Sequence, residues 1–204
     1  MPLQNRVTPF GAIVAVPGRG LFTGNRGILH DDRRHVVRPW QTRRWITCLL
    51  HYKGIRRPLM QPHRWTQLFF LDEAAALAAG HRPCAECRRD AYRRFQTLWR
   101  ARHGEPCDAD AMDWELHRSR LSGRAKRTYR AELAHQPDGA YVVLDASAWL
   151  VWGPELFEWS DAGYRQRRAR PAAMEVDVLT PRPVTAILEA GYRPEVHPSA
   201  AREP

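Results

Sequence analysis

The pair Cys84-x2-Cys87 constrains this chain more than any other feature of its 204 residues. Such a turn presents two thiolates at a separation that lets both bind one metal ion, and a structural zinc takes four Cys or His ligands. Cys48 is the third ligand that we expect. Cys107 follows a long predicted helix, and we expect it to be a free cysteine. The sequence therefore predicts that a zinc ion ties the segment around Cys48 to the turn.

The fourth ligand is open among five histidines. His51 is favoured because Cys48-x2-His51 has the compact spacing of a zinc knuckle. Side chains alternate between the two faces of a strand, so Cys48 and His51 point in opposite directions unless the strand ends or bulges there. We predict His51 as the ligand on that condition. The alternatives are His30, His63, His81 and His197.

The residues before the cysteine pair share a helix frame with a segment near the other end of the chain. Asp72 and Thr180 are suitable N-cap residues. Gly80 and Gly191 stand where a left-handed residue ends a helix. We interpret the repeated signals as helix punctuation, with an internal duplication as the alternative.

Apolar periodicity and turn residues predict an α+β fold of short mixed strands and helices rather than a repeated βαβ unit. The expected helices cover 73–79, 86–103, 111–121 and 181–190. The expected strands cover 11–16, 43–52 with a hairpin partner at 56–60, 67–71, 174–179, and a hairpin over 140–152. The expected regions are an N-terminal strand and glycine-rich loop at 1–40, a zinc-binding module at 41–104, and an α+β region at 105–204, which can form one compact unit with the rest.

The chain carries a formal net charge of +10, and 30 of its 32 basic residues are arginine. A basic domain with many aromatic residues has the electrostatic footprint of a nucleic-acid-binding protein, and a basic surface without a partner is the alternative. The sequence has no apolar run of transmembrane length, and its N-terminus lacks the apolar core of a signal peptide. We therefore expect a cytoplasmic protein that binds DNA and no membrane.

The stretch "FFLDEAAALAAGHRPCAEC" resembles the end of the zinc-binding domain of the adaptive-response (Ada) DNA-repair proteins over roughly residues 67–90. The resemblance implies zinc at Cys84 and Cys87 and binding to DNA. In that family four cysteines hold the zinc, and the first accepts a methyl group from a DNA phosphotriester. Here only Cys48 stands where the family has a Cys-x3-Cys pair. Fewer thiolates make a less nucleophilic site, so the resemblance implies zinc and DNA more than methyl transfer.

Several basic residues are candidates for contact with DNA phosphates. Arg89 and Arg93 fall opposite the apolar face of the helix that leaves the cysteine turn, where they form either a solvated face or a phosphate-binding stripe. The full set of candidates is Arg88, Arg89, Arg93, Arg120, Lys126 and Arg127. Lys126 is one of two lysines, and a lysine can also form a Schiff base, as a bifunctional DNA glycosylase requires.

The helix at 111–121 carries a candidate catalytic pair. Asp113 and His117 lie one turn apart, so the carboxylate could orient the imidazole as a general base, with a purely structural cluster as the alternative. The sequence therefore favours a zinc-containing enzyme that acts on damaged or modified DNA, by base excision or strand cleavage. A non-catalytic damage sensor and a stoichiometric alkyl acceptor, through Cys48 or Cys84, are the alternatives.

Overall fold

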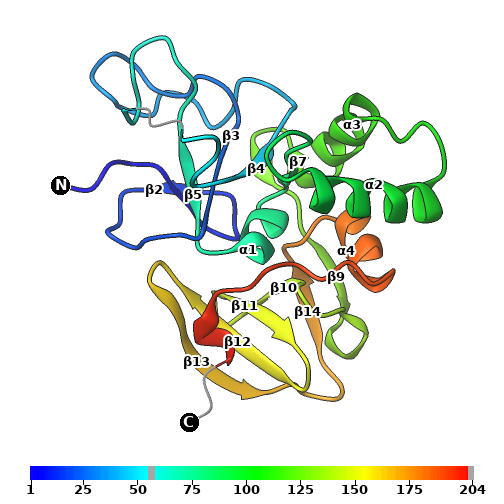
Figure 1. Ribbon diagram of the computed structural model, residues 1–204. Helices are drawn as coiled ribbons and strands as arrows, with labels where there is room; N and C mark the ends of the chain where they lie inside the picture. The colour runs from blue at the N-terminus through cyan, green and yellow to red at the C-terminus, as the bar shows by residue number, and fades with distance from the viewer. Residues whose placement is uncertain (55–57, 202–204) are drawn as a thin grey trace.

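The computed structural model describes residues 1–54 and 58–201, and it has the predicted α+β fold. Among these residues it has two six-stranded sheets, a small hairpin and four α-helices (Figure 1). The helices are α1 (Glu73–Ala78), α2 (Arg89–His103), α3 (Ala109–Arg120) and α4 (Arg182–Glu189), with two short 3-10 helices, η1 (Leu133–His135) and η2 (Pro198–Ala201).

The first sheet is built from the N-terminal third of the chain and the turn before the cysteine pair. Its strands, in spatial order, are β2 (Ile13–Val14), β1 (Arg6–Val7), β5 (Leu68–Phe70), β3 (Phe22–Asn25), β4 (Ile46–Leu49) and β6 (Arg82–Pro83). The pairs β1–β5 and β4–β6 are parallel, and the other neighbours are antiparallel. The sheet thus draws strands from both sides of residue 40.

The strand that carries Cys48 pairs differently from the predicted hairpin. Its neighbours are β3 and β6. Of the expected partner, residues 58–60 form no strand, with a turn at 59 and 60, and 55–57 lie outside the described residues. β3 occupies the segment expected to be a glycine-rich loop. A Cβ atom at Gly24 would lie 2.1 Å from the carbonyl oxygen of Ile46, so this glycine permits the close approach of the two strands.

The second sheet is antiparallel throughout. Its strands, in spatial order, are β13 (Gly163–Ala169), β12 (Glu155–Ser160), β11 (Ser147–Trp152), β10 (Tyr141–Leu144), β14 (Glu175–Val178) and β9 (Tyr129–Glu132), and the separate hairpin pairs β7 (Leu121–Ser122) with β8 (Ala125–Lys126). The hairpin predicted over 140–152 is confirmed, and its turn places Asp145 and Ala146 at positive φ. β9, β12 and β13 were not predicted.

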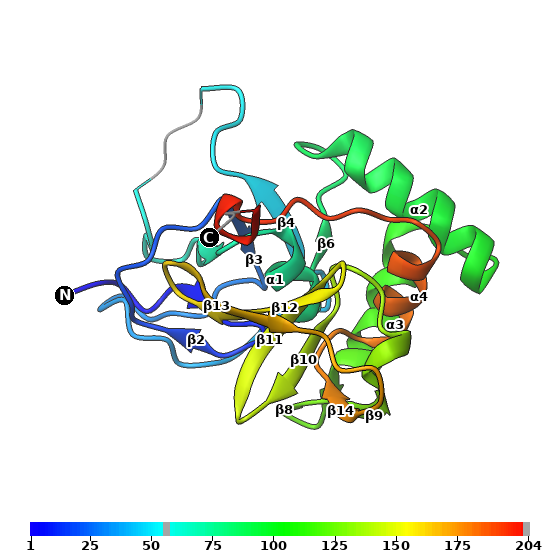
Figure 2. The same ribbon diagram turned by 90° about the horizontal axis from the view of Figure 1, so that it is seen from below.

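Helix α1 joins the two sheets and the helical layer, as Figures 1 and 2 show from two directions. All six of its residues are buried. Its side chains pack into three different cores. Ala75 faces the second sheet, Leu77 faces α2 and α4, and Ala76 faces the first sheet. The alanine-rich sequence therefore lets three layers approach one short helix.

The predicted ends of α1 are confirmed. The Asp72 side chain accepts a hydrogen bond from the Ala75 amide, and Gly80 has a φ of 93°. The same signals were predicted at the ends of α4. Gly191, after its C-terminus, also has a positive φ, but the prediction of Thr180 as its N-cap is wrong. Thr180 does not cap α4, because its hydroxyl accepts the Tyr141 amide of β10 instead.

The C-terminal segment after α4 crosses the N-terminus of α1 and reaches β13 (Figure 1). Glu73 and Glu195 exchange hydrogen bonds that include both of their backbone amides. The Asp72 carboxylate also accepts the His197 amide at 3.0 Å and the Tyr164 hydroxyl at 2.6 Å. The start of α1 is thus fixed by partners from distant parts of the chain, and the cysteine turn that follows it starts from a rigid base.

Candidate metal centre and its surroundings

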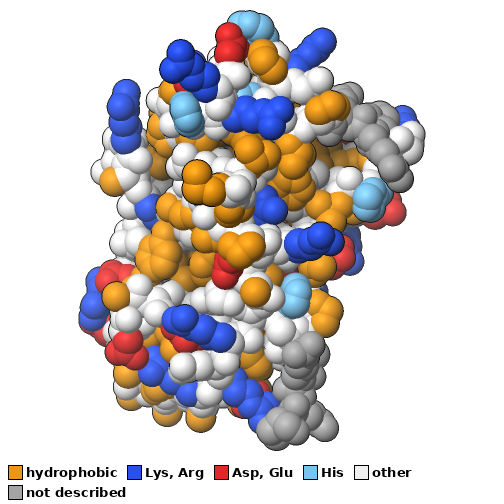
Figure 3. Space-filling view, turned by 90° about the vertical axis from the view of Figure 1, so that its left-hand side faces the viewer, with side chains coloured by type: hydrophobic (Ala, Val, Ile, Leu, Met, Phe, Trp, Pro, Cys, Tyr) orange, Lys and Arg blue, Asp and Glu red, His pale blue; other side chains and the backbone are white. Residues whose placement is uncertain are grey.

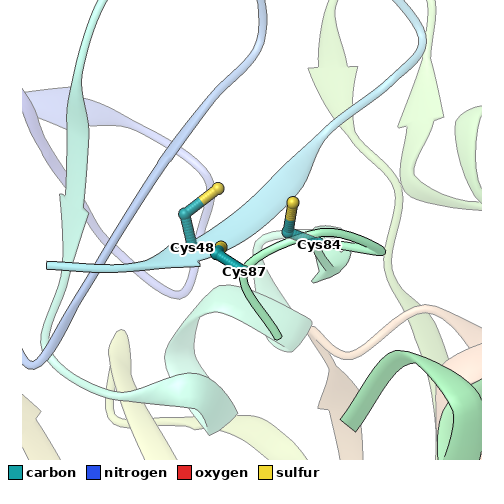
Figure 4. A group of neighbouring side chains, drawn as sticks. All are labelled: Cys48, Cys84 and Cys87. Carbon is teal, nitrogen blue, oxygen red and sulfur yellow. The ribbon is translucent and has the colours of Figure 1, made fainter. Parts of the chain in front are cut away.

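The structure brings Cys48 together with Cys84 and Cys87 (Figure 4). Their three sulfur atoms all lie within 4.8 Å of one another. Each side chain is half-buried, and none of the four cysteines forms a disulfide. Cys107, the fourth, is buried in the core between α2 and α4, apart from this group, as predicted for a free cysteine. The three thiols could therefore hold one metal ion.

Backbone pairing between β4 and β6 places the three thiols. The parallel register sets Thr47 beside Pro83, and the Cys84 amide donates to the Thr47 carbonyl at 3.0 Å. The Arg88 amide then donates to the Cys84 carbonyl at 3.2 Å, which closes a turn directly before α2. The Arg-Pro dipeptide before the cysteine pair thus acts as a short edge strand that aligns the pair with Cys48.

Backbone amides and neighbouring thiols stabilise negative charge on this group. The Glu86 amide donates to Cys84 Sγ at 3.4 Å. Hydrogen bonds from the Cys48 and Cys87 thiols, then from the backbone, lower the pKa of Cys84 well below its usual range. The hydrogen bond between Cys48 and Cys84 is also the main cause that raises the pKa of Cys48. The hydrogen bond with Cys87 and burial raise it further. The arrangement therefore favours negative charge on Cys84, and a bound cation would displace protons from the thiols that ligate it.

The predicted fourth ligand, His51, does not join the group. β4 ends at Leu49, so His51 lies beyond the strand, and the alternation of side chains along a strand does not turn it away from Cys48. The His51 side chain is nevertheless exposed, and among the described residues the group that could hold a metal ion consists of the three cysteines alone. Of the alternatives, His81 is fully buried, and Arg26 Nε donates to its Nε2 at 3.2 Å. His30 and His197 are hydrogen-bonded to Thr66 and Ser199.

The thiols line a hollow of about 320 Å³ whose walls are mainly apolar. A second hollow, of about 910 Å³, lies next to it and reaches the N-terminal part of α3. The two share three wall residues: Asn25, Ile46 and Trp65. We call the two hollows together the thiol groove.

The proposed pairing of Asp113 with His117 is wrong. Both carboxylate oxygens of Asp113 accept hydrogen bonds from Arg82, at 3.0 and 2.7 Å, and both side chains are buried. His117 instead contacts Arg120 through Nδ1 at 3.1 Å and packs edge-on against Trp40. The spacing of residues along one helix could not reveal that Arg82, from the Arg-Pro dipeptide, binds the Asp113 carboxylate. Partial burial, followed by the nearby positive charges, lowers the pKa of His117.

Three of the predicted phosphate contacts are engaged inside the protein. Arg88 is buried and forms an ion pair with Glu73 at 2.8 Å. Arg120 is buried against Trp45, with its guanidinium 3.8 Å from the ring centre. Lys126 donates to the carbonyl of Ala78 at the end of α1. Arg88 and Arg120 support the fold, since a buried cation is not available to DNA. Lys126 is half-buried, and its amine is engaged by a backbone carbonyl.

Two of the remaining candidates, Arg89 and Arg93, are exposed on α2, and Arg127 is exposed after the β7–β8 hairpin. Burial, and then the charges of Arg26 and Arg120, lower the pKa of Lys126 to about 7. Lys126 and the cysteine group lie on different elements, and no described contact joins them.

Comparison with family models, curated proteins and solved structures finds no match to this chain. The likeness to the Ada zinc-binding domain therefore rests on the residues around Cys84 and Cys87 alone. Among the described residues, none of the helices combines the length and the apolar character needed to cross a membrane.

Proposed function

We propose that this protein is a zinc-thiolate protein that binds damaged or modified DNA. The observation that carries the proposal is the convergence of Cys48, from β4, on the Cys84-x2-Cys87 turn. Thiolate ligands favour zinc and other soft metals over magnesium or calcium, which prefer oxygen. Zinc bound by these three residues would hold β4 against β6 and fix the floor of the thiol groove.

The charge of the protein and the Ada resemblance support DNA as the partner. A net charge of +10 attracts the phosphate backbone, and affinity from this source falls steeply with salt. The unpaired thiols are consistent with a cytoplasmic location, where cysteines stay reduced. Three cysteine ligands leave one position of a tetrahedral zinc for a ligand from outside the group.

A second candidate function is stoichiometric acceptance of an alkyl group from DNA. It is favoured by the half-burial of the three thiols and by their position in the wall of a hollow that can admit a ligand. Transfer would form a carbon–sulfur bond at a cysteine and break the bond between that carbon and a DNA oxygen, which keeps the electron pair. Base excision or strand cleavage stays a prediction, now without the Asp113–His117 pair.

The experiment that tests the main proposal compares metal-loaded protein with protein dialysed against a chelator. We expect about one zinc per chain and salt-dependent binding to DNA by the loaded protein, both weakened in Cys48→Ser. The Cys107→Ser variant is the control, because Cys107 lies in a separate core. Retention of full zinc content by Cys48→Ser and the corresponding Cys84 and Cys87 variants would contradict the proposal. Mass spectrometry after exposure to alkylated DNA tests the second candidate.

A further inference from the structure

The positive charge of the protein is concentrated in one part of the chain. Residues 1–71, which end where β5 meets α1, contain twelve basic residues and only two acidic ones, Asp31 and Asp32. Residues 72–204 contain twenty of each and are neutral overall. The whole excess of +10 therefore belongs to the segment that forms most of the first sheet and its loops. All six predicted phosphate contacts, including Arg89 and Arg93 of helix α2, lie in the neutral part.

The thiol groove crosses this basic part of the molecule. Among the residues that line its larger hollow are Arg43, Arg44, Trp65, Asp110, Asp113 and Trp114. Asn25, Ile46 and Trp65 border both this hollow and the smaller one, which is lined by the three cysteines. Figure 3 views the side of the molecule that carries the loops of the first sheet above and part of the second sheet below, and it shows hydrophobic side chains near the centre with Lys and Arg, and some Asp and Glu, around them. Such a surface combines apolar and cationic contacts.

The charges inside the groove leave one cation without a carboxylate partner. Arg44 pairs with Asp110 at 3.1 Å, and the charge of Asp113 is balanced by Arg82. Arg43 has no ion pair among the described residues, and its guanidinium lies 4.4 Å from the ring centre of Trp114. An arginine stacked on an aromatic ring at the edge of a hollow can contact both a phosphate and a base.

The groove also presents aromatic surface to solvent. Trp114 is 51% exposed and Trp65 is 53% exposed, and both line the larger hollow. Exposed tryptophans offer stacking platforms for unpaired bases, whereas the bases of a duplex are already stacked on each other. The hollow is large enough for a nucleotide, and its cationic rim suits the phosphates that follow.

We propose that the thiol groove binds single-stranded DNA, with one base stacked on Trp114, a phosphate held by Arg43, and the strand running past Trp65 towards the cysteines. The proposal deepens the proposed function and rests on it for the choice of DNA as the nucleic acid. It places the DNA contacts on α3, through Trp114, and on the loops of the first sheet, through Arg43 and Trp65, rather than on α2.

Fluorescence anisotropy with a labelled 20-nucleotide oligothymidylate tests this assignment. We expect tighter binding to the single strand than to a duplex or an RNA of the same length. Trp114→Ala should raise the Kd about 5- to 150-fold, the range measured for loss of one stacking platform. Arg43→Gln should reduce the slope of log affinity against log salt by about 0.7, as for one phosphate contact on a single strand.

Arg89→Ala on α2 is the matched control, since it removes an exposed arginine outside the groove. Circular dichroism and zinc content should be unchanged in all three variants, because each altered side chain is exposed. Preference for duplex or RNA, or loss of binding in Arg89→Ala but not in Trp114→Ala, would overturn the groove assignment and leave the proposed function in place. Failure of the zinc-loaded protein to bind any DNA would overturn both.

Discussion

Replacing Asp113 with alanine would leave the Arg82 guanidinium buried without its counter-ion. The two side chains are only 4% and 2% exposed, and they form two hydrogen bonds of 3.0 and 2.7 Å. Removing one partner of a buried ion pair lowers the free energy of unfolding by roughly 3–5 kcal/mol, because the remaining charge is neither solvated nor paired. For a chain of this size that loss lowers the Tm by about 6–20 °C. The main remaining acceptor for Arg82 is the carbonyl of Pro83.

Thermal and urea unfolding of the zinc-loaded protein measure this loss. Asp110→Ala is the control on the same helix: Asp110 is 82% exposed and pairs with the exposed Arg44, so its removal should cost at most about 1 kcal/mol. Replacing Arg82 with methionine in the Asp113→Ala background should recover part of the stability, because the uncompensated charge is then gone. An Asp113→Ala protein with unchanged unfolding and a lost DNA-processing activity would refute this reasoning and restore Asp113 as a catalytic residue.

Three further outcomes are expected. Tyr164→Phe removes a hydroxyl that donates to Asp72 at 2.6 Å, and urea unfolding should show a loss of about 1–3 kcal/mol. Lys126 has a pKa lowered to about 7, so the unfolded chain binds more protons above that pH, and the unfolding free energy should rise with pH from about 7 towards 10.5. Lys126→Met should show a smaller rise between pH 7 and pH 9, and an equal rise would contradict this. If the protein excises bases or cleaves DNA through His117, His117→Ala should lower turnover about 10²- to 10⁴-fold, while unchanged turnover would leave His117 a structural role.

Local signals in the sequence were sufficient for the helices around the cysteine turn. Asp72 and Gly80 mark the ends of α1 because capping depends on neighbouring backbone groups. The Cys84-x2-Cys87 spacing likewise indicates a metal ligand pair without knowledge of the fold. Thr180 shows the limit of such signals, since a partner on a distant strand took the hydroxyl that could have capped α4.

The contacts of the candidate site depended on tertiary structure. Arg82 and Asp113 are 31 residues apart, and only the position of β6 beside α3 brings them together. Arg88 and Arg120 were predicted from the sequence to contact DNA phosphates, yet each is buried against an aromatic ring. The strands β12 and β13 were missed because the arginine-rich, exposed residues of β13 lack a clear apolar alternation. The division of charge at residue 71, in contrast, can be read from the sequence alone.

Metal content of the protein and its cysteine variants tests the central claim most directly. The protein is purified without added metal, analysed for zinc, and then reconstituted with cobalt so that thiolate coordination can be followed by absorption. We predict about one metal ion per chain and a sulfur-to-cobalt charge-transfer band that weakens in Cys48→Ser, Cys84→Ser and Cys87→Ser but not in Cys107→Ser. Well-folded protein without metal and without such a band, or a band that survives loss of Cys48, would contradict the account.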